Sequence, residues 1–174
     1  LGELSLAGVE SIEVYRGAVP ARFGGNSIGG VVNIRTRRPG KGSVFGLQVG
    51  GGSFATHQLS VTTSSTLKAS ELMGLLAYIA SRNDFRFIDD NGTEYNLHDD
   101  VWTRRANSDF HSLNSLVKVA RPWGRSHLLA HTTLDLSQRG IPGISNNQAL
   151  HTRYDTWNIL AELELFGPLA SWVQ

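Results

Sequence analysis

Two strand-like patterns separated by paired glycines occupy residues 9–39, and they constrain the fold of this chain more than any other feature. Residues 11–15 alternate polar with β-branched or aromatic side chains, and residues 31–34 begin a second run of the same kind. Between them stand two glycine pairs, which begin at Gly24 and Gly29. Such pairs indicate backbone that needs positive φ or close approach to another element. The segment therefore predicts two strands joined by a glycine-rich connection.

The fixed residues of this segment resemble the end of the plug domain of TonB-dependent outer-membrane receptors. In that family, E-x-I-E-V-x-R-G precedes an aromatic residue followed by glycine, and then G-G-V-x-N-I leads into the barrel. Ala18 departs from the pattern, because the family usually has proline there. The matching positions here are Glu10, Ile12, Glu13, Val14, Arg16, Gly17, Phe23, Gly24, Gly29, Gly30, Val31, Asn33 and Ile34.

A hydrolase-like pattern, Gly-x-Ser-x-Gly, lies inside the same segment at residues 25–29. A nucleophile elbow needs a helix after its serine, so that Oγ stands at the top of a sheet. Here Gly30 and the β-branched Val31 follow instead, which predicts the start of a strand. We interpret the glycines as architectural and the protein as a non-enzyme. A secreted hydrolase built on Ser27 is the third-ranked hypothesis.

Composition excludes several other classes. The 174 residues carry a formal net charge of +1, which argues against a nucleic-acid partner. The chain has no cysteine, so it has neither a disulfide framework nor a cysteine-ligated metal. Its longest apolar run, residues 72–80, is far shorter than the roughly 20 residues of a spanning helix. A membrane can then be crossed only by a closed β-barrel.

From Ser43 onward, six segments alternate apolar and polar residues in the manner of barrel strands. The segments are residues 45–49, 58–63, 72–82, 112–120, 128–136 and 157–165, of which the third is apolar on both faces. We predict that Gln48 and Asp135 face a lumen and that the apolar members face lipid. The predicted lipid-facing residues are Phe45, Leu47, Val49, Leu128, Leu134, Ile159 and Leu163.

The connections alternate in length. Short turns are expected at residues 65–70, 121–124 and 166–168, and long polar loops at residues 84–109 and 138–151. The first external connection, around residues 50–56 with a turn at residues 51–53, is also short and departs from this alternation. Outer-membrane barrels have short periplasmic turns and long external loops in this rhythm. A soluble β-sandwich would also alternate polar and apolar residues, but it explains neither the loop lengths nor the plug-like leader.

The predicted fold class is all-β: the N-terminal strands of a large antiparallel transmembrane β-barrel, preceded by the C-terminal part of a plug domain. Residues 1–40 are assigned to the plug and residues 41–174 to about six barrel strands. Plugged transporters carry about 22 strands, so we expect an internal fragment of a longer protein. Residues 1–3 do not begin a signal peptide, which agrees with that expectation.

Hard oxygen ligands are concentrated in the longest loop. Calcium prefers such ligands, and some relatives in the resembled family bind calcium in this loop. An EF-hand is excluded, because aligning Gly92 with its glycine places His98 where glutamate is required. A solvated acidic turn with Asn91-Gly92 at a hairpin tip is the alternative. The tentative calcium ligands are Asp89, Asp90, Asn91, Asp99 and Asp100.

His127 and His131 share a strand face, but four strand residues separate them by roughly 13 Å. They cannot bind one ion together, and we expect the six histidines to line the lumen or the surface singly. Arg104-Arg105 is a candidate contact for outer-membrane lipid and lipopolysaccharide, although a solvated loop charge is the simpler interpretation.

The resemblance implies active import across the outer membrane of a Gram-negative cell. The ligand would be scarce, of the iron-siderophore, haem or cobalamin type, and TonB with its inner-membrane complex would supply the energy. By the same resemblance, Glu13 and Arg16 would help to lock plug to barrel, with Arg16 paired to glutamates of later strands absent from this chain. Gly17, Gly24, Gly29, Gly30 and Asn33 would shape the plug. A passive or adhesin-like barrel is the alternative.

Overall fold

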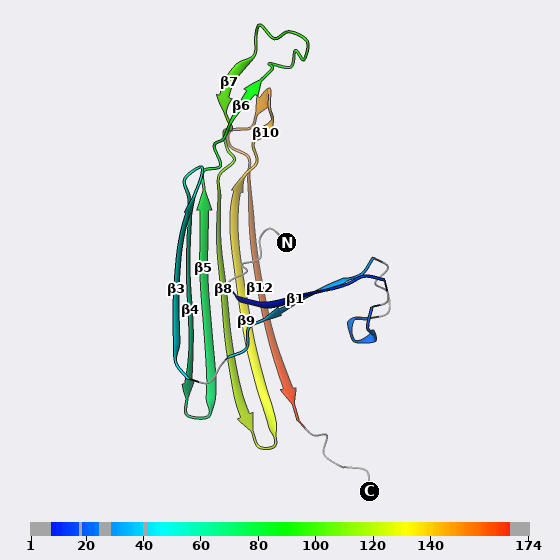
Figure 1. Cartoon of the computed structure of the whole chain (residues 1–174), viewed down its shortest axis with the longest axis vertical. Coiled ribbons are helices and arrows are strands. Elements are labelled where there is room, and N and C mark those ends of the chain that lie inside the picture. Colours follow the sequence, from blue (N-terminus) through cyan, green and yellow to red (C-terminus); the bar gives the residue numbers. More distant parts are fainter. Residues whose placement is uncertain (1–7, 18, 25–28, 40–41, 168–174) are drawn as a thin grey trace.

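A computed structural model describes residues 8–17, 19–24, 29–39 and 42–167 of the chain. Its main feature is a large antiparallel sheet in the order β12-β9-β8-β5-β4-β3, a meander in which each strand pairs with the next (Figure 1). The strands are β3 (Val44–Gly52), β4 (Thr56–Leu67), β5 (Ser70–Ser81), β8 (Phe110–Trp123), β9 (Ser126–Gly140) and β12 (Arg153–Phe166). The predicted all-β antiparallel fold is confirmed. No helix in the described ranges is long and apolar enough to cross a membrane.

The two faces of the large sheet differ as the alternation predicts. One row of directly paired residues crosses the sheet as Leu47, Val61, Leu76, Ser115, Leu134 and Ile159. The adjacent row is Gln48, Ser60, Ala77, Asn114, Asp135 and Asn158. Because directly paired residues share a face and successive residues alternate, these rows lie on opposite faces. All seven residues predicted to face lipid share the first face, which we call the free face.

The other face, called the docking face, carries a second, smaller sheet. This small sheet pairs β1 (Val9–Tyr15) with β2 (Val31–Thr36), and a short 3-10 helix, η2 (Ala21–Phe23), lies between them in sequence. Figure 1 shows the small sheet projecting crosswise from the middle of the large one. Two strands joined by a glycine-rich connection are thus confirmed, with β2 two residues longer than residues 31–34.

Three of the predicted glycines have the backbone that the sequence indicates. Gly17 and Gly24 have φ of 77° and 87°. Gly30 has φ of 115°, and a Cβ there would collide with the carbonyl oxygen of Tyr15. Gly29 has no neighbour within 4 Å of such a Cβ, so the structure gives no steric reason for that glycine. Ser27 of the hydrolase-like pattern lies outside the described residues.

The first turn of the large sheet differs from its predicted position. The sequence places it at residues 51–53, but β3 continues to Gly52 and Thr56 N donates to Ser53 O at 3.2 Å. The two residues between, Phe54 and Ala55, have φ of 57° and 53°. The turn therefore lies within the predicted connection around residues 50–56, but its left-handed residues are Phe54 and Ala55 and not the glycines at positions 51 and 52.

Both long loops contain short hairpins. The sequence predicts a hairpin in the first loop only as the alternative to a calcium site, and it does not predict the hairpin in the second loop. The first loop holds β6 (Arg86–Asp89) and β7 (Val101–Arg104), and the second holds β10 (Gly143–Ile144) and β11 (Asn147–Gln148). Asn107 joins the two loops, because its side-chain amide donates to Ile141 O (3.1 Å), Ala149 O (2.9 Å) and Thr152 O (2.7 Å). The backbone N–H of Ala106 also donates to Gln148 Oε1 at 2.7 Å.

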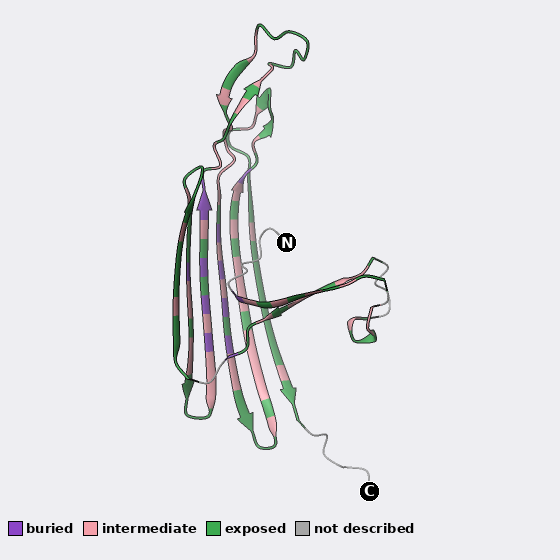
Figure 2. Ribbon diagram, viewed as in Figure 1, coloured by how far each residue is buried: buried purple, intermediate pink, exposed green. Residues whose placement is uncertain are grey.

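Burial is concentrated in the middle of the large sheet. Figure 2 shows most buried residues on β5 and β8, while the edge strands β3 and β12 are largely exposed. The apolar members of this core include Met73, Leu75 and Leu116, which share the docking face near the base of the small sheet. The core therefore sits where the two sheets meet.

Candidate functional site at the junction of the two sheets

Lys118 connects the two sheets. It lies on the docking face of β8 and is only 4% exposed. Its ammonium donates to Thr36 Oγ1 at 2.5 Å and to Thr36 O at 3.4 Å. Thr36 is the last residue of β2, so a charged group of the large sheet holds the base of the small sheet.

Gly8 brings the same base close to the core. Its carbonyl oxygen accepts from Arg37 N at 2.9 Å, which continues the pairing of β1 and β2 beyond the strand ends. A Cβ on Gly8 would stand 2.8 Å from Leu75 Cδ2 and 3.4 Å from Leu116 Cδ2. Glycine at this position therefore lets the backbone lie directly on two buried leucines.

A cavity of about 1190 Å³ opens at this junction. The small-sheet region contributes Glu10 and Arg38 to its lining. The large sheet contributes eight charged or titratable residues, which are Glu71, Lys118, Arg121, His127, His131, Asp135, Glu162 and Glu164. The carboxylates of Glu10, Glu162 and Glu164 attract the Lys118 ammonium and Arg38 repels it. The junction is therefore lined by charged groups of both signs, which suits a water-accessible contact between separable parts better than a permanent core.

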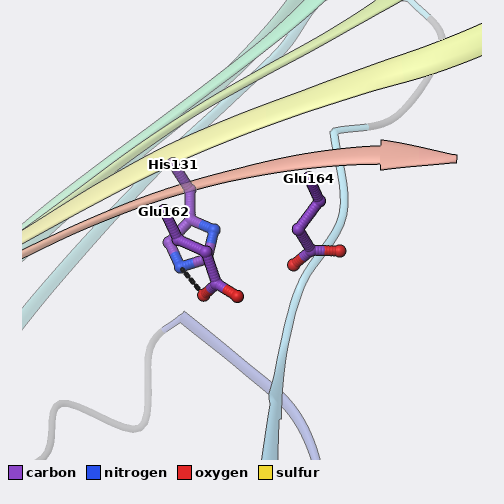
Figure 3. A group of neighbouring side chains, drawn as sticks. All are labelled: His131, Glu162 and Glu164. Carbon is purple, nitrogen blue, oxygen red and sulfur yellow. Dashed lines mark ion pairs between the residues drawn. The ribbon is translucent and has the colours of Figure 1, made fainter.

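Strand register assembles three of these residues into a compact group. His131 on β9 is directly paired with Glu162 on β12, and Glu164 lies two residues further along the same face. The His131 Nε2 and Glu162 Oε2 atoms are 3.3 Å apart. One possible ligand atom from each of the three residues lies within 4.8 Å of the others. Figure 3 shows the ring and both carboxylates projecting to the same side of the strands.

Glu13 is the centre of a polar cluster within the small sheet. Its carboxylate accepts from Asn33 Nδ2 (3.0 Å), from the Tyr15 hydroxyl (2.9 Å) and from Arg35 Nη1 (3.4 Å). Arg22 Nη2 stands 3.9 Å from the same carboxylate. The hydrogen bond from Asn33, followed by that from Tyr15, holds the pKa of Glu13 below its ordinary value of 4.5. The plug-motif residue Asn33 thus stabilises the charged form of Glu13.

Arg16 stands apart from this cluster. It is exposed, and the described residues offer it no hydrogen bond or ion pair. The cations beside Glu13 are Arg22 and Arg35 instead. The structure does not test the glutamate partners that the resemblance implies for Arg16, so its part in locking stays a prediction.

The acidic loop brings only some of its predicted calcium ligands together. Asn91 Nδ2 donates to the Asp99 carbonyl oxygen at 2.5 Å, and Thr93 Oγ1 donates to the Asp99 carboxylate at 2.7 and 2.8 Å. Asp89 and Asp90 accept from the backbone N–H groups two residues later. Asn91-Gly92 forms a tight turn, with φ of 48° and 78°, but residues 90–100 separate β6 from β7. Calcium binding stays a prediction.

Comparison with known proteins gives one partial match. No family model matches the chain. A stretch of 69 residues is 41% identical to the vitamin B12 transporter BtuB of Photobacterium profundum. The match covers 39% of this chain and 11% of that protein. The chain therefore spans a small part of the length of the curated relative that it matches.

Proposed function

We propose that this chain is a segment of a TonB-dependent transporter of the outer membrane. In this proposal the large sheet is part of a barrel wall and the small sheet is the end of a plug. The partial match to a vitamin B12 transporter supports the assignment, as does the plug-like motif of residues 10–34. The observation that carries it is the Lys118–Thr36 contact, which fixes a plug-like strand pair on the polar face of a barrel-like sheet.

The free face supports a place in the membrane. Phe45, Val49 and Leu163 are 72%, 73% and 70% exposed, and they belong to a face whose members are mainly apolar. A continuous apolar surface of this kind needs lipid or a partner to cover it. The strands are long enough, because β8, β9 and β12 have 14, 15 and 14 residues and a spanning strand needs about 9–11.

The junction suggests how transport is gated. The small sheet lies on the docking face through one buried ammonium, a glycine contact and a charge-lined cavity. Energised import requires such a contact to open, and polar groups that water can solvate open at less cost than an apolar core. TonB with its inner-membrane complex would supply that work. The relative is a vitamin B12 transporter, which favours a cobalamin-type ligand over an iron-siderophore or haem.

Uptake of labelled cyanocobalamin by cells that express the intact protein tests this proposal. We expect uptake that depends on TonB and falls in Lys118→Met, while ligand binding at the cell surface is retained. Lys68→Met is the matched control, because Lys68 lies in the exposed turn between β4 and β5. Uptake that persists without TonB would favour a passive barrel, and surface adhesion without uptake would favour the adhesin-like alternative.

A further inference from the structure

We propose that His131, Glu162 and Glu164 form a binding site for a divalent transition-metal ion, for which Zn²⁺ is the appropriate probe. The inference concerns the docking face of β9 and β12 and does not depend on transport. An imidazole with two carboxylates is a mixed nitrogen and oxygen ligand set that suits zinc. Calcium and magnesium prefer sites made of oxygen ligands alone, so this site is distinct in chemistry from the acidic loop.

The backbone places the three side chains without help from a loop. Direct pairing of His131 with Glu162 and the two-residue repeat to Glu164 put all three on one face of a hydrogen-bonded ladder. Zinc ligands in tetrahedral geometry stand about 3.4 Å apart, since each is about 2.0–2.1 Å from the ion. The separation of His131 Nε2 and Glu162 Oε2, 3.3 Å, already meets this requirement. One ligand atom of Glu164 lies within 4.8 Å of the other two, so zinc binding requires only a small movement of this side chain.

A second observation comes from the imidazole itself. The side chain of His131 is 15% exposed, and its Nδ1 atom is shielded from solvent with no hydrogen-bond partner in the described part of the chain. A neutral imidazole has one nitrogen lone pair. When its proton is on Nδ1, the Nε2 lone pair faces the Glu162 carboxylate, and a cation bound between these two atoms gives both of them a partner.

The charges around the group are compatible with a cation. Lys118 is directly paired with His131, and its ammonium is held at Thr36. Two carboxylates against one ammonium leave a net charge of about −1 when His131 is neutral. The other charged residues that line the cavity are three carboxylates and three cations, which balance each other; they are Glu10, Glu71, Asp135, Arg35, Arg38 and Arg121. The site therefore retains the negative charge that a divalent ion requires, and the cavity leaves room for water as a fourth ligand.

Calorimetric titration of the intact, metal-free protein in detergent with Zn²⁺ tests the site. We expect one saturable zinc per chain, weakened by about tenfold or more in His131→Gln and in Glu164→Gln. His127→Gln is the matched control, because His127 lies on the same face of β9 but is directly paired with Phe166 and does not belong to the ligand group, and this variant should bind zinc as the wild type does. X-ray absorption at the zinc edge should show nitrogen and oxygen ligands and no sulfur.

Two results would overturn the proposal: no saturable zinc heat at micromolar to millimolar concentrations, or wild-type affinity in both His131→Gln and Glu164→Gln. Circular dichroism of each variant identifies loss of folding. Glu164 is a half-buried residue of β12, whereas Glu162 is exposed, so Glu162→Gln provides a further variant if His131→Gln fails to fold. Loss of zinc binding with unchanged cobalamin uptake would separate this site from the transport proposal.

Discussion

Lys118 on β8 donates a hydrogen bond of 2.5 Å to the hydroxyl of Thr36, a residue 82 positions earlier in the chain. The bond is the polar connection between the base of the small sheet and the docking face. Lys118 is 4% exposed, so its ammonium gives up most of its hydration and depends on the acceptors that the small sheet provides.

Removal of the Thr36 acceptor should destabilise the contact between the two sheets more than removal of the Lys118 donor. Thr36→Val leaves a buried ammonium without its hydroxyl partner, at a cost of about 1–3 kcal/mol. Lys118→Met removes the charge as well as the bond, so its cost should be smaller. In the double variant the Thr36→Val effect should largely disappear. Hydrogen exchange of residues 31–36 in the intact protein measures the stability of this contact. Equal exchange rates in the wild type and Thr36→Val would contradict the prediction.

The small sheet should lose stability in acid through Glu13. The folded-state pKa of Glu13 is lowered, mainly by the Asn33 hydrogen bond. The stabilisation is therefore complete above the ordinary value of 4.5 and is lost as the pH falls through the lowered folded pKa. Asn33→Ala should move the pKa back toward 4.5 and weaken this pH dependence. Carboxyl carbon NMR of Glu13 checks the shift; titration at or above 4.5 in the wild type would contradict it.

The loop end of the large sheet should depend on Arg153. Its guanidinium donates to both carboxylate oxygens of Asp109, at 3.1 and 2.8 Å, and these bonds lower the pKa of Asp109. Both side chains are about one-third exposed, so Arg153→Met should cost no more than about 1 kcal/mol. The pKa of Asp109 should rise in the same variant. Arg125→Met, at the opposite end of β8 and β9, is the control for thermal unfolding and should change nothing.

The free face should be the one that contacts lipid. The chain has no native cysteine, so single cysteines can carry spin labels without background. Labels at Leu47 and Ile159 should be reached by oxygen dissolved in the bilayer, while labels at Gln48 and Asp135 should be reached by a water-soluble nickel chelate. The reverse pattern would mean that the docking face contacts lipid, which contradicts the proposed wall.

Calcium binding by the acidic loop would stabilise the contact between Asn91 and Asp99. If the five predicted ligands bind the ion, calorimetry should detect calcium in the micromolar to millimolar range, and Asp90→Ala should weaken it. Glu94→Ala, in the same loop but outside the predicted ligand set, is the matched control. The absence of calcium heat at millimolar concentration would leave the loop as a solvated acidic turn.

The alternation of residues predicts the faces of the large sheet well, because lipid-type and polar surroundings select side chains with a period of two. Phe45, Leu47 and Val49 show this alternation within a single strand. The face of each residue can therefore be predicted without knowing how the strands pair. Alternation does not predict the short strands β6 and β7. Four residues carry too little periodicity to distinguish a strand from an irregular loop.

The junction could not be predicted from the sequence, because it depends on pairs that are distant in the chain. In the sequence, Lys118 is one polar residue among several on an alternating strand. No nearby residue indicates that its partner is Thr36. His131 likewise acquires Glu162 only through the register of β9 and β12. A comparison of His131 with His127 along one strand does not reveal the pairing of His131 with Glu162, because Glu162 lies on the neighbouring strand.

The three carbonyl groups held by Asn107 make the two long loops mechanically dependent on each other. An amide nitrogen has two hydrogens, so the three acceptors share them, and a movement of Asn107 changes all three contacts at once. A displacement that begins in the β6–β7 hairpin is consequently transmitted to the β10–β11 hairpin. A molecule that binds one loop therefore affects the conformation of both. An insertion in either loop must leave the backbone conformation of the other loop unchanged.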